Sequence, residues 1–291
     1  MEKVKPPAPG IYENVPFDEY LKWDAFSKSM VKHILRSPAH LKHAMHSDTK
    51  SDAMVFGSLV DCMLLEPHDY DKSFAVLPAT YIATDGKTKP WNNRSKKCKE
   101  YRDGLFESGK MVITEPLKEK AHEVVRSIRL HPTASDWLGR GTYQVSMVWR
   151  DDDFGVICKA RIDIHIEHER LVDLKMSHNA CRSEFTRTIN NYLYHVQAAM
   201  YCDAYQKLTQ GIMLPWSFIV AESEQPHGVA AYDLDEDAIM TGRAIYKKAL
   251  ATYKQCKELD LWPAYSQFAE PITIPAYAIM QDIPDEVING I

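Results

Sequence analysis

Lys-Ala-Arg-Ile-Asp-Ile-His-Ile-Glu-His-Glu-Arg-Leu-Val-Asp-Leu-Lys, residues 159–175, alternates apolar and polar side chains on both sides of a charged turn. Apolar residues at every second position predict β-strands, here over residues 156–166 and 170–175. The preceding segment, residues 143–150, alternates in the same way and ends at the turn Asp151-Asp-Asp-Phe-Gly155. Three consecutive strands joined by short turns therefore form the centre of the predicted fold.

The segments on either side have a helical period or form further strands. We expect two more strands over residues 216–221 and 228–233, and helices over residues 26–35, 51–66, 114–130, 183–209 and 235–258, with another starting at Pro38. Strands in a meander followed by a helix and more strands favour an α/β fold with a mixed central β-sheet flanked by helices. The helices before the first strand would form an N-terminal helical elaboration.

The composition is ordinary for a globular protein of 291 residues, with 45% hydrophobic and 26% charged residues. This apolar content excludes disorder as the main state. The net charge of −5 excludes a uniformly basic nucleic-acid binder, although it does not locate the charges. No apolar run reaches the ~18 residues of a membrane span, no signal-peptide pattern opens the chain, and the cysteines are scattered. We therefore expect a cytoplasmic protein with reduced thiols and no membrane association.

Two aspartates and a lysine converge in the central hairpin. Asp163 and Asp173 are equidistant in sequence from His168, so direct pairing would bring their side chains to about 4.5–5.5 Å. Asp173 and Lys175 lie two positions apart and share one strand face. One explanation is a structural salt bridge of Asp173 with Lys175 or Arg161. The other is a Mg²⁺ site, because Mg²⁺ prefers one or two carboxylates plus waters and phosphate oxygens. Spacing alone leaves both open.

Several motifs in this order resemble the PD-(D/E)XK nuclease superfamily. Ile162-Asp163, followed by Val172-Asp-Leu-Lys175, resembles its D…DxK signature. Gln197-Ala-Ala-Met-Tyr201 resembles the QxxxY element of the RecB-like and RecE-like branches, with both polar residues on one helix face. The segments Phe56-Gly-Ser-Leu-Val-Asp-Cys-Met-Leu-Leu-Glu-Pro67 and Phe26-Ser-Lys-Ser-Met-Val-Lys32 resemble the RecE-type exonuclease, exodeoxyribonuclease VIII. The resemblance implies a PD-(D/E)XK (restriction-endonuclease-like) fold.

The resemblance also implies roles for individual residues. The implied catalytic residues are Asp163, Asp173, Lys175, Gln197 and Tyr201, and the implied metal ligands are Asp61, Asp163, Asp173 and the carbonyl of Leu174. These ligands would hold one or two Mg²⁺ ions, for which Mn²⁺ is expected to substitute, while Lys175 positions the attacking water. Gln197 and Tyr201 would fix the substrate backbone or the lysine. The RecE-type helix usually carries histidine where this chain has Asp61, which leaves a different branch or metal preference open.

As a RecE-like protein, the whole chain 1–291 would form a single nuclease domain. We expect a mainly helical part over residues 1–140, the catalytic sheet and helices over 141–260, and a C-terminal extension over 261–291. The resemblance implies an exonuclease that hydrolyses linear double-stranded DNA from its ends, in the 5′→3′ direction, in phage-type recombination. It also implies a ring-like homo-oligomer, a single-strand annealing protein as partner and a bacterial host cell. Two alternatives stay open: a catalytically inactive nuclease-like module that binds DNA or protein, and an endonuclease or nickase of the same superfamily.

The most basic part of the chain spans residues 85–102. The residues for which we predict DNA phosphate contacts are Lys87, Lys89, Arg94, Lys96 and Lys97 in this segment, together with Arg161 and Arg182 near the proposed site. The segment has Gly86 and Pro90 and few apolar residues, so we expect a mobile loop that runs into a helix. A solvated surface loop without a binding function is the alternative.

Overall fold

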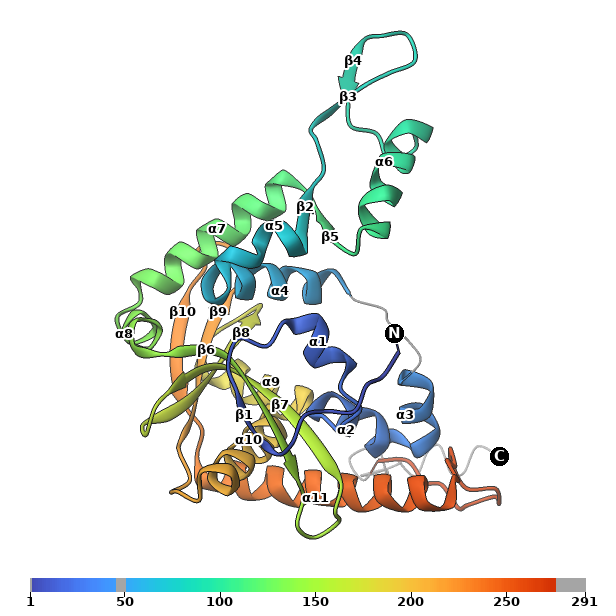
Figure 1. The fold of residues 1–291 in the computed structure, drawn as a ribbon, viewed down its shortest axis with the longest axis vertical. Helices are drawn as coiled ribbons and strands as arrows, with labels where there is room; N and C mark the ends of the chain where they lie inside the picture. Colours follow the sequence, from blue (N-terminus) through green and yellow to red (C-terminus); the bar gives the residue numbers. More distant parts are fainter. Residues whose placement is uncertain (1, 46–50, 276–291) are drawn as a thin grey trace, which may run out of the picture.

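A six-stranded mixed β-sheet forms the centre of the computed structural model, which describes residues 2–45 and 51–275 (Figure 1). The strand order is β1-β6-β7-β8-β9-β10, and neighbours are antiparallel except for the parallel pair β8 and β9. The strands are β1 (Gly10–Tyr12), β6 (Thr142–Arg150), β7 (Ile157–Ile166), β8 (Arg170–Ser177), β9 (Trp216–Glu222) and β10 (Val229–Asp233). The predicted α/β fold with a mixed central sheet is confirmed, and β1 is an edge strand that the sequence pattern did not predict.

The hairpin of β7 and β8 has the predicted register. Ile164 pairs with Val172, so continuing the same register places Asp163 opposite Asp173. His168 in the connecting turn has a φ of 59°, the left-handed conformation that short hairpin turns often need. The two aspartates therefore lie on adjacent strands at the point where the ladder ends.

Two layers of helices cover the sheet, each with its own buried apolar cluster. One layer contains α2 (Lys28–Arg36), α3 (Pro38–Ala44), α9 (Arg182–Tyr192), α10 (Tyr194–Thr209) and α11 (Glu236–Leu259). The other contains α4 (Asp52–Leu65), α7 (Glu115–Leu130) and α8 (Pro132–Arg140). Figure 1 shows α11 along one side of the molecule and α4 and α7 toward the other. We call the first cluster, with Phe26, Phe185 and Trp216, the α10 core, and the second, with Leu59, Val124 and Ile219, the α4 core.

The apolar side chains of β6 and β7 change from one core to the other along each strand, and on β7 the change occurs at Asp163. Ile162 belongs to the α10 core, whereas Ile164, two residues later, belongs to the α4 core. On the paired strand, Val145 lies in the α10 core and Tyr143 packs against the α4 core, with Gln144 between them at a φ of 54°. In a regular strand, residues two positions apart point to the same face of the sheet, so Ile162 and Ile164 would lie in one core. The change of face therefore places Asp163 where the two helical layers meet.

One predicted helix is wrong. The segment 183–209 forms two helices, α9 and α10, because Leu193 between them has a left-handed φ of 56°. This conformation is sterically costly for a residue with a branched side chain. The break brings Tyr194, the first residue of α10, to Phe218 of β9, with ring centroids 6.2 Å apart.

The predicted loop over residues 85–102 contains the second strand of a β-hairpin and the start of the expected helix. Strands β3 (Thr80–Ile82) and β4 (Thr88–Pro90) pair antiparallel, and α6 (Lys96–Glu107) follows. We call residues 77–110 the arm. It leaves the body between β2 (Phe74–Val76) and β5 (Met111–Ile113), which pair in parallel. Figure 1 shows the arm projecting from the end of the molecule opposite α11.

The short helices α1 (Phe17–Lys22) and α5 (Tyr70–Ser73), with a 3-10 turn over Pro67–Asp69, complete the described elements. Within residues 2–45 and 51–275, no helix combines the length and the hydropathy that a bilayer crossing needs. The organisation of the whole chain as a single nuclease domain stays a prediction. Residues 276–291 of the predicted C-terminal extension lie outside the described residues.

Candidate active site

Asp173 on β8 is the centre of the predicted site. Its side chain is almost fully buried, and Nε2 of Gln197 on α10 donates a hydrogen bond to Oδ1 over 2.6 Å. The ammonium of Lys175 lies 2.5 Å from Oδ2. This second contact is a salt bridge between a buried carboxylate and a half-buried ammonium. Strand and helix thus bring together three of the predicted catalytic residues.

Asp163 on β7 is held by the neighbouring strand. The backbone N–H of Leu174 donates to Oδ2 of Asp163 over 2.9 Å, in place of a regular ladder bond. Burial raises the pKa of Asp163 well above its usual value, and the negative charges of Asp173 and Asp61 raise it further. Leu174 therefore positions Asp163 through its amide, while the predicted role of its carbonyl as a metal ligand stays a prediction.

Asp61 joins this group from the helix α4. Burial raises the pKa of Asp61 to about 7; the charges of Asp173 and Glu66 add to the shift and Lys175 opposes it. These effects place Asp61 within electrostatic range of Asp173 and Lys175. Among the described residues, however, Asp61 forms no hydrogen bond or ion pair with Asp163, Asp173 or Lys175.

Tyr201 lies one turn after Gln197 on α10, as predicted. Its ring is buried and meets Trp216 edge to face, with centroids 5.6 Å apart. Burial raises the pKa of the Tyr201 phenol well above its usual value, and the nearby charges of Asp173 and Asp163 act in the same direction. Tyr201 therefore stays a neutral phenol, and a role in holding the substrate is still a prediction.

The structure adds Lys28 and Tyr194, which sequence reasoning missed. The ammonium groups of Lys28 and Lys175 lie 5.1 and 4.9 Å from the centroid of the same Tyr194 ring. Lys28 also donates to the carbonyl of Tyr192 over 2.9 Å. Burial lowers the pKa of Lys28 to about 8, and the positive charge of Lys175 lowers it further. Lys28 lies between two serines at the start of a helix. The sequence pattern there indicates helix capping and does not show that Lys28 reaches the site.

The donor atoms of the site suit a hard divalent cation. Three carboxylates near one lysine leave an excess of buried negative charge, and oxygen donors are what Mg²⁺ prefers. In the described ranges 2–45 and 51–275, however, no three His, Cys, Asp or Glu side chains are already arranged to hold an ion. Because Lys175 contacts Oδ2 of Asp173, a cation at that oxygen would compete with the lysine.

Comparison with known proteins identifies the family. The family model described as "PDDEXK-like domain of unknown function (DUF3799)" matches residues 27–273. The chain belongs to this PDDEXK-like family. The predicted superfamily is therefore confirmed, while the RecE-like branch stays a prediction.

One solved structure has a fold similar to that of this chain. A crystal structure described as that of a "Putative exonuclease" from Eubacterium rectale aligns with a TM-score of 0.60 and 14% identity, covering 96% of this chain and 99% of that chain. At this identity the likeness supports the fold. The structure of SSO0001 aligns with a TM-score of 0.27 and 12% identity, covering 79% of this chain and 90% of that chain. This score is too low to indicate a shared fold. No curated protein matches the sequence.

Arg161 has a structural role in this PDDEXK-like protein, which corrects its prediction as a DNA contact. Its side chain is 5% exposed, and NH2 pairs with Oε1 of Glu66 over 2.8 Å. Nε donates to Gln144 over 2.6 Å and NH1 to the carbonyl of Val15 over 2.7 Å. Because Glu66 caps the C-terminal end of α4, this network ties the helix of Asp61 to the strand of Asp163. Of the predicted alternative, a salt bridge of Asp173 with Lys175 or Arg161, the pair with Lys175 is present, whereas Arg161 pairs with Glu66.

The other residues predicted to contact DNA are exposed. Arg182 begins α9, and the remaining five lie on the arm: Lys87, Lys89, Arg94, Lys96 and Lys97. The structure therefore brings the acidic residues of the PDDEXK-like site together but does not bring the basic segment into that group.

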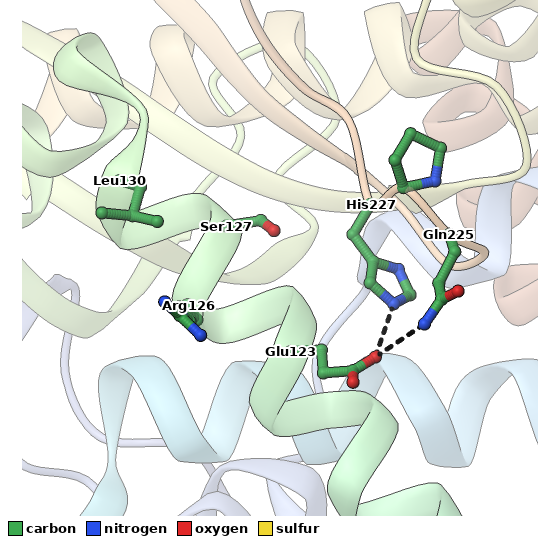
Figure 2. Close-up of a pocket in the computed structure, with 7 residues that line it drawn as sticks. Glu123, Arg126, Ser127, Leu130, Gln225 and His227 are labelled. Atoms are coloured by element: carbon green, nitrogen blue, oxygen red, sulfur yellow. Dashed lines mark hydrogen bonds and ion pairs between the residues drawn. The ribbon is translucent and has the colours of Figure 1, made fainter.

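A groove of about 650 Å³ lies between α7 and the turn that joins β9 to β10 (Figure 2). Glu123 accepts from Nε2 of Gln225 over 3.4 Å and contacts Nε2 of His227 at 3.2 Å. The groove contains none of the predicted site residues.

Proposed function

We propose that this chain is a Mg²⁺-dependent deoxyribonuclease that hydrolyses DNA phosphodiester bonds. The observation that carries the proposal is the placement of Asp163 and Asp173 on adjacent strands, with Lys175 in contact with Asp173, within a PDDEXK-like fold. Nucleases of the PD-(D/E)XK superfamily generally use divalent metals, and the donor set fits such an ion. Bound Mg²⁺ would neutralise charge on the scissile phosphate and favour ionisation of the attacking water.

In this mechanism the carboxylates hold the ion and Lys175 acts as a cation. Burial lowers the pKa of Lys175, but the charges of Asp173 and Asp163 outweigh burial and keep that pKa above its usual value. In the metal-free protein Lys175 is therefore a cation, and a cation at this place would suit the orientation of water and the stabilisation of negative charge in the transition state.

Gln197 and Tyr201 support these groups from α10. The hydrogen bond from Gln197 fixes one oxygen of Asp173 and leaves the second to face Lys175. Orientation of this kind by an outer residue tunes the affinity of metal sites. Tyr201 would offer its phenol to the DNA backbone.

The resemblance to RecE-type proteins supports a finer proposal. The enzyme would digest linear double-stranded DNA as a 5′→3′ exonuclease in phage-type recombination in the cytoplasm of a bacterial host. It would act as a ring-like homo-oligomer with a single-strand annealing protein, and Mn²⁺ would replace Mg²⁺. Digestion of end-labelled linear duplex with each end blocked in turn tests the polarity: blocking the 5′ ends should stop digestion, whereas digestion from blocked 5′ ends would refute it.

A second candidate is a nuclease-like module that binds DNA or protein without cleaving. The ionic contact of Lys175 with Asp173 and the lack of three assembled ligands among the described residues favour this candidate. Incubation with linear and circular duplex in Mg²⁺ separates the possibilities. An exonuclease shortens only linear DNA, an endonuclease or nickase also converts circles, and a binder shifts DNA without shortening it.

A further inference from the structure

The arm, residues 77–110, is anchored beside the helix that carries Asp61. The parallel pair of β2 and β5 forms its base, with Phe74 opposite Met111 and Val76 opposite Ile113. Phe74 and Ile113 are buried in the α4 core, where they pack with the apolar face of α4. The base of the arm is therefore part of the body, although the arm itself projects from it (Figure 1).

The hairpin and the helix of the arm are joined to each other. The ammonium of Lys97 on α6 donates to the carbonyl of Ile82 on β3 over 3.2 Å. Trp91 meets Tyr101 edge to face with centroids 5.9 Å apart, and Cys98 of α6 is buried. These contacts join the hairpin and the helix of the arm, so the basic residues lie on connected elements instead of a loose loop.

The charge of the arm is opposite to that of the remaining chain. The arm, residues 77–110, has eight basic and four acidic residues, a net charge of +4, whereas the whole chain carries −5. The rest of the chain therefore carries −9. A polyanion would be repelled by that body and attracted to the arm.

Some basic side chains of the arm form no ion pair within the described residues. Lys89 pairs with Asp85 over 2.9 Å, and Lys96 lies 3.8 Å from Glu100. Within the described residues, Lys87, Arg94 and Lys99 have exposed side chains and no ion pair. These three charges are available to a ligand.

We propose that the arm binds the phosphate backbone of duplex DNA, outside the acidic site that cleaves it. DNA as the ligand rests on the proposed function, and charge complementarity favours it over a protein partner. Duplex DNA carries one negative charge per ~1.7 Å of its axis, so a fixed array of cations can contact several phosphates without reading the sequence. The arm would hold duplex on one side of the site while a strand is cut at the other.

The test measures binding rather than cleavage, so it does not depend on the nuclease proposal. The variant Lys87→Gln, Arg94→Gln, Lys99→Gln removes the three free charges and none of the contacts that build the arm. A matched variant, Lys5→Gln, Arg129→Gln, Lys248→Gln, removes three exposed charges from the body. Affinity for labelled duplexes of increasing length is measured in EDTA over a range of salt concentrations.

We expect the arm variant to bind long duplex more weakly and to lower the slope of log affinity against log salt by about 3, roughly one per lost phosphate contact. The body variant should bind like wild type. On duplexes too short to reach the arm, wild type and arm variant should be equal. Equal affinities and slopes of the arm variant and wild type on long duplex would overturn the proposal. So would a change of oligomeric state, measured by sedimentation, without a change in DNA binding, since the arm would then be a protein-contacting surface.

Discussion

Gln197 on α10 donates a hydrogen bond from Nε2 to Oδ1 of Asp173 on β8, over 2.6 Å. The bond joins the helix that follows the left-handed Leu193 to the strand at the centre of the sheet. It also decides which oxygen of Asp173 is left for Lys175 or for a cation.

Replacing Gln197 by alanine should lower nuclease activity about 10- to 100-fold, because residues that orient a metal ligand typically contribute that much. Raising the Mg²⁺ concentration should restore part of the loss. Gln206→Ala, at an exposed position of the same helix, is the control and should leave activity unchanged. Unchanged activity in Gln197→Ala would show that the bond is only structural.

Asp61→Asn should stabilise the metal-free protein while it impairs the metal site. Burial raises the pKa values of Asp61 and Asp163, and the negative charges of the neighbouring carboxylates raise them further, so the charged form of Asp61 is disfavoured in the folded protein. Removing one charge should raise the free energy of unfolding in EDTA by roughly 1 kcal/mol and reduce the stabilisation that Mg²⁺ gives. Thermal unfolding with and without Mg²⁺ measures both, with the exposed Asp71→Asn as control. A less stable metal-free Asp61→Asn protein would contradict the account.

Lys28→Met should raise the KM for DNA about tenfold or more, since a charge-assisted bond to a phosphate contributes about 1.5–3 kcal/mol. Lys28 faces the site beside Lys175 and has no carboxylate in contact among the described residues, so an incoming phosphate would be its counter-ion. Lys32→Met, on the exposed side of the same helix, should leave KM unchanged.

The pH dependence distinguishes this role of Lys28 from a packing role. Burial lowers the pKa of Lys28 to about 8, so wild type has the charge below that pH and loses it above. The difference in KM between wild type and Lys28→Met should therefore be largest below pH 8 and shrink as the pH rises through it. A difference that does not change with pH would indicate lost packing.

Arg161→Ala should destabilise the protein by about 3–5 kcal/mol, because it leaves the half-buried carboxylate of Glu66 without its partner. The paired variant Arg161→Met with Glu66→Met should cost much less, since it removes both charges together. Urea unfolding measures these differences. If Arg161→Ala keeps full stability and instead lowers the salt dependence of DNA binding, Arg161 is a DNA contact after all.

The strands and the D…DxK hairpin were predictable because a period of two is a local signal. It defined β7 and β8 and the register that sets Asp163 against Asp173. The family resemblance, and no local pattern, predicted the roles of Asp61, Gln197 and Tyr201. In the structure Gln197 donates to Asp173, and Asp61 lies within electrostatic range of the same carboxylate.

Other features depend on long-range contacts that no local pattern shows. The break at Leu193 places a leucine in a conformation that leucine rarely adopts, so the segment 183–209 had the pattern of one helix. Arg161 is buried because Val15, Glu66 and Gln144 reach it from three distant segments. Lys28 and Lys175, from α2 and β8, both contact the ring of Tyr194, which directly follows the break.

The most direct test of the central claim is the rate at which the purified protein releases nucleotides from end-labelled linear duplex with Mg²⁺ and with EDTA. We predict digestion in Mg²⁺ only, a loss of about 100-fold or more in Asp173→Asn and in Lys175→Met, and wild-type rates in Asp71→Asn. Digestion by Asp173→Asn and Lys175→Met at the wild-type rate would contradict the account.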